Sequence, residues 1–153
     1  MTLICGMEFI YEGGFQNILK ALSCNQTFSE NKWAVDCLWV EGSTGESYQE
    51  MNNQTYAGSE LLSQFSCLDE SFVYFARIRE YATSSDIDHI SAFEDFLKSR
   101  CTMIILVMDS CFCEIYAKSE EELLSIKSNL ASLFSIDAKI IPMNKITRVE
   151  LTV

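Results

Sequence analysis

The stretch from Cys101 to Phe134 constrains the fold of this chain more than any other part of the sequence. It begins with an eight-residue apolar run, Cys101–Met108, which ends at Asp109-Ser110. Apolar and polar residues then alternate from Cys111 to Lys118, and Ser119-Glu-Glu-Glu122 has the Ser-x-x-Glu pattern of a helix start. Because strand, turn, strand and helix follow one another, the sequence predicts a hairpin in a sheet with an amphipathic helix packed on it.

Apolar patterns in the rest of the chain predict further strands and helices around this hairpin. We expect strands in 3–11, 33–40, 72–78, 138–143 and 146–153, and helices in 15–22, 59–65 and 90–97. The order mixes hairpins with strand-helix-strand steps, which favours an α+β domain over a doubly wound parallel sheet. We therefore predict that residues 1–153 form one domain, with a single mixed or mainly antiparallel sheet of about six or seven strands and about four helices packed on it.

Some details of this prediction depend on a few residues. Ser59 is expected to cap its helix, and Ser91-Ala-Phe-Glu94 has the pattern of a capping box. Segment 42–53 is either a loop or a short hairpin, and the last two strands are expected to pair as a closing hairpin. Period-two alternation in the second strand places four side chains on one face: Trp33, Val35, Cys37 and Trp39.

The charge balance is strongly acidic, with 22 Asp and Glu against 11 Lys and Arg and a net charge of −11. Such a surface repels nucleic acid and anionic membranes, so we expect neither as a partner. It attracts a basic protein, although the same charge also serves solubility alone. Both interpretations remain open from the sequence.

Cysteine usage and the N-terminal residues indicate a cytoplasmic location. The seven cysteines are odd in number and most lie inside apolar strand or helix patterns, which is typical of reduced, buried thiols. The first residues lack the basic and long apolar regions of a signal peptide. No apolar run reaches the roughly 20 residues that a membrane-spanning helix requires. We expect free thiols.

Arg77 and Arg79 are the charges most suited to face a ligand. They lie two apart, on one face of a strand that otherwise reads as buried, and paired guanidinium groups bind carboxylates or phosphates well. Half-buried arginines more often pair with structural carboxylates. Glu8, Asp36 and Glu114, each in the middle of a strand, are the plausible partners.

The acidic loop Asp86-Ile-Asp88-His89 is a second candidate. It contains the only histidine of the chain, and two carboxylates with an imidazole suit a divalent ion or an acid-base pair. Acidic residues before a helix also arise simply because they complement its dipole. Together with Arg77 and Arg79, these residues define a possible small-molecule or metal-dependent site.

Aromatic residues around the irregular central segment are the candidates for partner binding. Trp33, Trp39, Tyr48 and Tyr56 surround it, and exposed aromatic side chains often anchor protein interfaces. The alternative is that both tryptophans belong to the core of their strand.

Cys111 and Cys113 form the only close pair of cysteines, and on one strand face both sulfurs could meet one soft metal ion. A second close pair is missing from the sequence, so we interpret Cys111, Cys113, Ile115 and Ala117 as one buried strand face. Gly-x-Gly-x-x-Gly, Walker-type, His-Glu-x-x-His and Gly-x-Ser-x-Gly motifs are also missing. The sequence therefore predicts no cofactor, no metal and no catalytic residue, and it favours a protein that is not an enzyme.

The passage from the apolar strand into Val-Met-Asp-Ser and then Glu-Ile-Tyr-Ala-Lys resembles a small bacterial family of about this length. That family is known only as a domain of unknown function. The resemblance lies mainly in Cys101–Lys118. It implies a cytosolic bacterial protein and transfers no catalytic residue.

Three functional hypotheses follow. The leading one is a non-enzymatic binding module for a protein partner, basic if charge attracts it, similar in kind to an immunity or antitoxin-like protein. The second is the small-molecule or metal-dependent site around Arg77, Arg79, Asp86, Asp88 and His89. The third is a structural homo-oligomer, such as a homodimer, in which Ile146–Val153 pairs across a two-fold axis.

Overall fold

A computed structural model describes residues 4–42, 49–67, 71–146 and 150–151. These residues form one seven-stranded sheet in the order β3-β2-β4-β5-β6-β1-β7, with every neighbouring pair antiparallel. With four α-helices packed against it, the sheet confirms the predicted α+β class. The strands are β1 (Ile4–Ile10), β2 (Lys32–Gly42), β3 (Gln54–Ala57), β4 (Ser71–Tyr81), β5 (Met103–Met108), β6 (Phe112–Ala117) and β7 (Lys139–Pro142).

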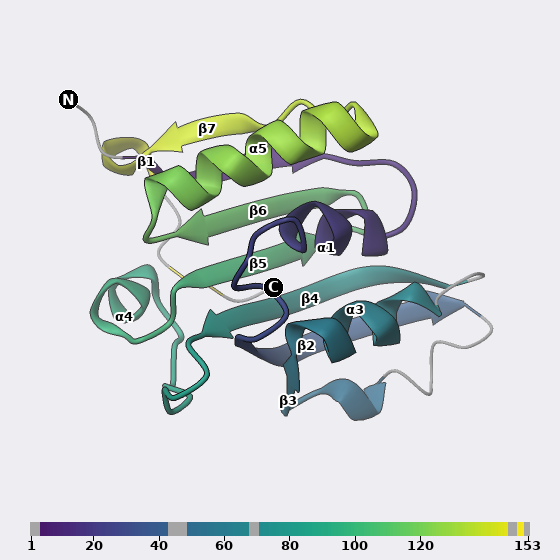
Figure 1. Cartoon of the computed structure of the whole chain (residues 1–153), viewed down its shortest axis with the longest axis horizontal. Coiled ribbons are helices and arrows are strands. Elements are labelled where there is room, and N and C mark those ends of the chain that lie inside the picture. The colour runs from purple at the N-terminus through teal and green to yellow at the C-terminus, as the bar shows by residue number, and fades with distance from the viewer. Residues whose placement is uncertain (1–3, 43–48, 68–70, 147–149, 152–153) are drawn as a thin grey trace.

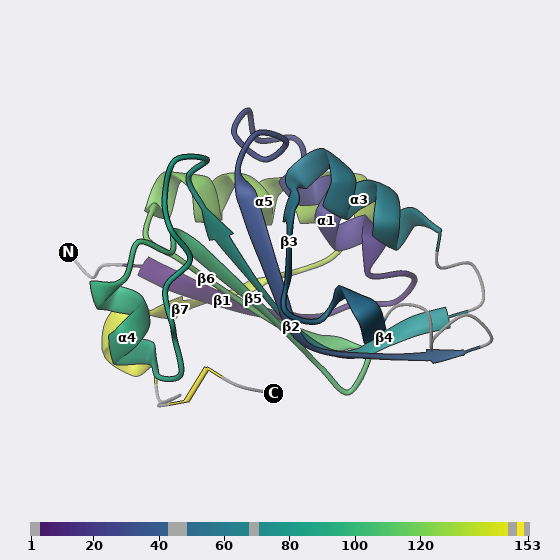
Figure 2. The same ribbon diagram turned by 90° about the horizontal axis from the view of Figure 1, so that it is seen from below.

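The helices cover the two faces of the sheet unequally. Three of them, α1 (Gln16–Leu22), α3 (Gly58–Ser66) and α5 (Glu120–Phe134), lie on one face, as Figures 1 and 2 show. The short helix α4 (Phe93–Lys98) lies on the other face, at one end of the sheet (Figure 2). We call the first the helical face and the second the open face. Short 3-10 helices, η1 (Gln49–Met51) and η2 (Met143–Lys145), complete the described elements.

Strand β5 shows why the chain needs cover on both faces. Its Met103, Ile105 and Val107 pack in the core beneath the three helices, whereas Ile104 and Leu106 pack in a second core on the open face. A central strand that is buried on both sides has no polar alternation, which explains the continuous apolar run in the sequence. The hairpin prediction for β5 and β6 is confirmed.

The second core is built from the loop before α4, from α4 itself and from the C-terminal end of the described chain. Leu151 is fully buried there, its N–H donates to the carbonyl of Ser91 at 2.9 Å, and Glu150 forms a β-bridge with Ala92. Met143–Lys145 turns as η2 instead of linking a hairpin. The predicted closing hairpin is therefore wrong for the described residues, because the chain crosses to the open face and buries Leu151 there.

The predictions about turns and caps met different outcomes. Asp109 and Ser110 both have positive φ, at 53° and 63°, in the β5–β6 turn, and Ser119 Oγ accepts the N–H of Glu122 at 3.1 Å, as expected for an N-cap. Ser59 does not cap α3, which begins at Gly58. At α4 the cap comes from Asp95, whose carboxylate accepts the N–H groups of Ser91 and Ala92.

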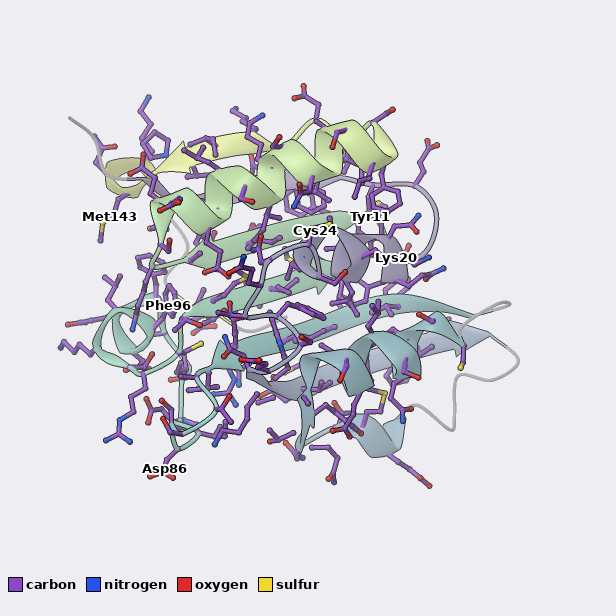
Figure 3. All side chains as sticks on the ribbon, viewed as in Figure 1. Tyr11, Lys20, Cys24, Asp86, Phe96 and Met143 are labelled. Carbon is purple, nitrogen blue, oxygen red and sulfur yellow. The ribbon has the colours of Figure 1, made fainter. Side chains whose placement is uncertain are left out.

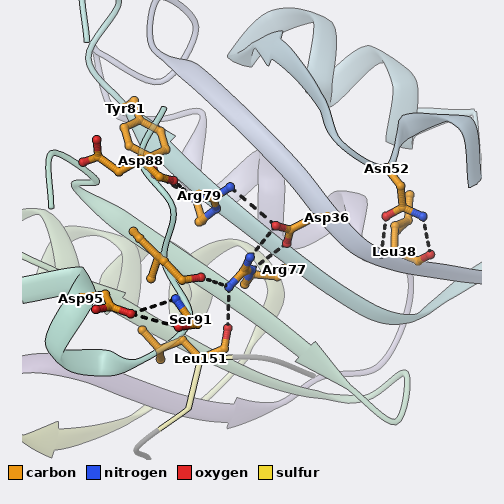
Figure 4. Close-up of polar contacts among 11 residues, drawn as sticks. Asp36, Leu38, Asn52, Arg77, Arg79, Tyr81, Asp88, Ser91, Asp95 and Leu151 are labelled. Atoms are coloured by element: carbon orange, nitrogen blue, oxygen red, sulfur yellow. Dashed lines mark hydrogen bonds and ion pairs between the residues drawn. The ribbon is translucent and has the colours of Figure 1, made fainter. Parts of the chain in front are cut away.

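The predicted alternation in β2 is wrong from Cys37 onward, because Cys37 is exposed and not part of the core that holds Trp33 and Val35. Cys37 has a φ of 53° and the register against β4 shifts between Asp36 and Trp39, so the strand contains a bulge. The side-chain amide of Asn52 accepts the N–H of Leu38 at 2.7 Å and donates to its carbonyl at 3.0 Å (Figure 4). Because the bulge inserts one residue, Leu38 faces the helical core and Trp39 faces the opposite side.

Candidate functional site

A row of apolar side chains crosses the part of the open face that α4 does not occupy. Trp39 of β2 lies opposite Phe75 of β4, Met108 of β5 lies opposite Phe112 of β6, and Phe112 lies opposite Ile10 of β1. The β4–β5 pairing reaches Ala76 and Val107, and Phe75 and Met108 are the next residues along these two strands. Directly opposed residues share a face, so these side chains are neighbours across five strands. We call them the apolar row: Ile10, Trp39, Phe75, Met108 and Phe112.

The apolar row is accessible at both ends. Trp39 is 51% exposed and Ile10 is 70% exposed, while the three side chains between them are half-buried. No described helix lies over it, because α4 occupies the other end of the open face (Figure 2). A contiguous apolar surface of this kind is typical of a protein interaction site.

A groove at the Ile10 end continues the row toward β7. It has a volume of about 620 Å³, and Ile10, Phe112, Phe134 and Ile136 form its apolar walls. Its charged lining residues are three carboxylates, Glu8, Glu12 and Asp137, and one ammonium group, Lys139. At the other end of the row, Glu41 accepts the indole N–H of Trp39 at 2.6 Å. The surroundings of the apolar row are therefore predominantly negative.

Of the four aromatic residues predicted for partner binding, only Trp39 belongs to this row. Trp33 is 1% exposed, and its indole N–H donates to the Phe28 carbonyl at 3.1 Å, as a core residue would. Tyr56 lies opposite Trp33 on β3 and packs against the core. Tyr48 lies outside the described residues. Sequence analysis missed the rest of the row, because only the register of five strands brings those residues together.

The two predicted arginines lie on the open face, in the second core (Figure 4). Arg77 donates from Nε and Nη2 to the two carboxylate oxygens of Asp36, at 2.7 and 2.5 Å, and from Nη1 to the carbonyls of Ile90 and Leu151, at 2.5 and 3.1 Å. The hydrogen bond to Asp36 raises the pKa of Arg77. Among the carboxylates considered from the sequence, Asp36 is thus the structural partner, and Arg77 fastens two separate chain segments to the sheet.

Arg79 is held differently. Its Nη1 donates to the Tyr81 hydroxyl at 2.9 Å and to the Asp88 carbonyl at 2.6 Å, and its Nη2 lies 3.5 Å from Asp36 Oδ2. The guanidinium group also lies 5.7 Å from the centre of the Tyr81 ring. Its Nε is buried and has no hydrogen-bond partner among the described residues.

The acidic loop covers the arginines with its backbone and turns its side chains away from them. Asp88 Oδ2 accepts the N–H of Arg100 at 2.6 Å, and Asp86 lies 3.7 Å from Arg100 Nη1. Asp86 extends outward at the periphery (Figure 3), and His89 is exposed. These three residues line a shallow depression with Lys98 and Arg100, whereas Arg79 lines a separate cavity with Asp36. The predicted ligand-binding residues are therefore close together, but their side chains do not converge on one cavity.

The cysteines occupy different environments. Cys113 is buried in the helical-face core with Ile115 and Ala117, and burial raises its pKa, whereas Cys111 is exposed in the turn before β6. The shared strand face predicted for Cys111 and Cys113 is therefore wrong. All seven cysteines are free thiols. The described residues contain no cluster of three or more His, Cys, Asp or Glu side chains that could hold a metal ion.

A model of a protein family described as a protein of unknown function, DUF2691, matches residues 6–152. The chain belongs to the DUF2691 family. The match includes the apolar row and the arginine network, so both lie within the region that this DUF2691 protein shares with its family model. Comparisons with curated proteins and with solved structures found no match. Within the described ranges, this DUF2691 chain has no helix with the length and apolarity needed to cross a membrane.

Proposed function

We propose that this chain is a non-enzymatic, cytoplasmic binding module of bacterial origin, and that a basic partner protein docks on the apolar row. The observation that carries the proposal is the row itself, which exposes an indole at one end and an isoleucine at the other. Large, rigid aromatic side chains contribute much of the binding energy in protein interfaces. The free thiols support a reducing compartment.

Charge complementarity determines which kind of partner fits. The groove beside Ile10 presents Glu8, Glu12 and Asp137 against Lys139 alone, and the whole chain carries a net charge of −11. A partner with lysine or arginine around an apolar patch would meet carboxylates at the rim of the row. A second copy of this chain would bring the same carboxylates against each other, which opposes self-association through this face.

An exposed, hydrophobic edge in Ile146–Val153 would support the homo-oligomer hypothesis. In the part of the chain that the structure describes, Leu151 is buried in the second core, on the open face, and its N–H donates to the Ser91 carbonyl. It is therefore not available at a sheet edge. The row therefore gives the protein-binding hypothesis a more specific surface than the terminal residues give to oligomerisation.

The proposal predicts that a Trp39→Ala, Ile10→Ser double variant loses its partner. We expect the immobilised wild-type chain to capture a protein of high isoelectric point from a lysate of its source cells. The purified partner should then bind the double variant at least about tenfold more weakly in calorimetry, because both accessible ends of the row are removed. Raising the salt from about 50 to 500 mM should weaken the wild-type complex, since rim charges are screened.

The matched control is Leu124→Ser, which removes an exposed apolar side chain from α5, on the helical face. It should bind the partner like the wild type. Equal binding by the double variant, a complex insensitive to salt, or no captured basic protein at all would each reject the proposal.

A further inference from the structure

The buried cluster of Arg77, Arg79 and Asp36 carries two positive charges and one negative charge. Arg77 and Arg79 are each 7% exposed, and Asp36 is the carboxylate paired with them within the described residues. Asp36 gives both oxygens to Arg77, at 2.7 and 2.5 Å, and leaves Arg79 only the 3.5 Å approach of Nη2. One guanidinium group is therefore buried without a carboxylate of its own, in a chain whose net charge is −11.

The hydrogen bonds of Arg79 show the same deficit. A guanidinium group has five N–H donors arranged as a planar fork. Those of Nη1 reach the Tyr81 hydroxyl and the Asp88 carbonyl, whereas the N–H of Nε has no partner among the described residues. Buried donors are normally satisfied, so an unpaired one at a charged group indicates that another acceptor belongs there.

A cavity of about 280 Å³ adjoins this arginine. Thr55 lies on the same face as Arg79, since Ala34 opposes both of them in register. Asn53, Gln54 and Ile87 also line the cavity, but Gln54 lies opposite Val35 of the helical-face core, so the register turns its side chain away from Arg79. Amide and hydroxyl groups supply additional hydrogen-bond donors around a space large enough for a carboxylate or phosphate group.

We propose that this cavity binds a small oxyanion, a carboxylate or a phosphate group, through Arg79 with the help of Asn53 and Thr55. The negative charge of Asp36 does not oppose the anion strongly, because both of its oxygens are engaged by Arg77. The ligand replaces the missing carboxylate of the buried arginine pair. This site is separate from the apolar row, so the test of anion binding and the test of partner binding have independent outcomes.

The test is a titration of the intact, ¹⁵N-labelled chain with sodium phosphate and, separately, sodium acetate, with sodium chloride keeping the ionic strength constant. We expect the Nε–H resonance of Arg79 and the backbone amides of 53–55 to shift and saturate, with a dissociation constant of about 1 mM for one of the two anions. Saturation with phosphate alone assigns a phosphate ligand, and saturation with acetate alone assigns a carboxylate.

Two variants distinguish a built site from an adventitious ion only. Arg79→Lys keeps the charge but removes Nε–H, and it should abolish the saturable shift. If that variant does not fold, Thr55→Val removes a hydroxyl from the exposed wall and should weaken binding about threefold, whereas Thr27→Val, on a distant exposed loop, should leave it unchanged. Shifts that never saturate, or that are the same in Thr55→Val and Thr27→Val, would show an adventitious ion only and overturn the proposal.

Discussion

Replacement of Asp36 by alanine should lower the free energy of unfolding by about 3–5 kcal/mol, because the change leaves two buried guanidinium groups without a carboxylate. Asp36 is the acceptor for both Nε and Nη2 of Arg77, and its Oδ2 lies 3.5 Å from Nη2 of Arg79. Urea denaturation of the wild type and the variant measures the loss directly. The effect is large because the destabilisation comes mainly from unpaired charge in a low-dielectric interior.

The same variant should also loosen the cover of the open face. Arg77 donates to the carbonyls of Ile90 and Leu151, and the Leu151 N–H bonds to Ser91. When Arg77 loses Asp36, these contacts lose their fixed geometry, so the amide of Leu151 should exchange with solvent faster in Asp36→Ala than in the wild type.

Asp86→Ala is the matched control for the Asp36 variant. It removes a carboxylate of the same kind, but one whose pairing with Arg100 is exposed to water, and such pairs contribute little. A loss for Asp36→Ala as small as that for Asp86→Ala would show that the arginine network is not the structural anchor that its geometry indicates.

The elements with a local signal could be predicted from the sequence. The apolar run of β5 and the Ser119 cap of α5 each depend on neighbours within a few residues, and both are present in the structure. Trp39 shows where such reasoning fails. Its direction is set by a bulge at which Asn52 binds the backbone of Leu38, 14 residues earlier in the chain, and nothing in the period-two pattern of β2 reveals it.

The candidate sites were predicted less completely than the fold for a related reason. The pattern identified Arg77 and Arg79 as buried arginines and offered three carboxylates as partners, but only the β2–β4 register places Asp36 opposite Arg77. Likewise, Ile10 and Phe112 become neighbours only because β1 pairs with β6. Periodicity gives the face of a strand, whereas a site depends on which strands are adjacent and in what register.

Two carboxylates on the helical face, Glu80 and Glu122, make stability depend on pH in an unusual direction. Glu80 is 2% exposed, and its carboxylate accepts Thr102 Oγ1 at 2.7 Å and Asn31 Nδ2 at 3.2 Å. Burial raises the pKa of Glu80. Burial, together with the negative charge of Glu80, raises the pKa of Glu122 at the start of α5 to about 7.

The sign of the effect follows from these two raised pKa values. The folded chain binds protons more tightly than the unfolded chain, whose glutamate pKa is about 4.3, so this contribution to stability is complete below about pH 4.3 and is lost as the pH rises through 7. We expect the free energy of unfolding to fall by about 2 kcal/mol between pH 5 and pH 8, after partial solvent screening of Glu122. Thermal or urea denaturation across this range measures it.

Glu122→Gln should remove most of this dependence and make the chain more stable than the wild type at pH 8. It deletes the titrating group and also the charge that Glu80 must face. Glu121→Gln, one residue earlier and exposed, removes the same charge from the same helical turn and should keep the wild-type slope. If both variants flatten the pH dependence equally, the cause is the overall charge of the chain. A specific Glu80–Glu122 interaction requires Glu122→Gln to flatten it and Glu121→Gln to leave it unchanged.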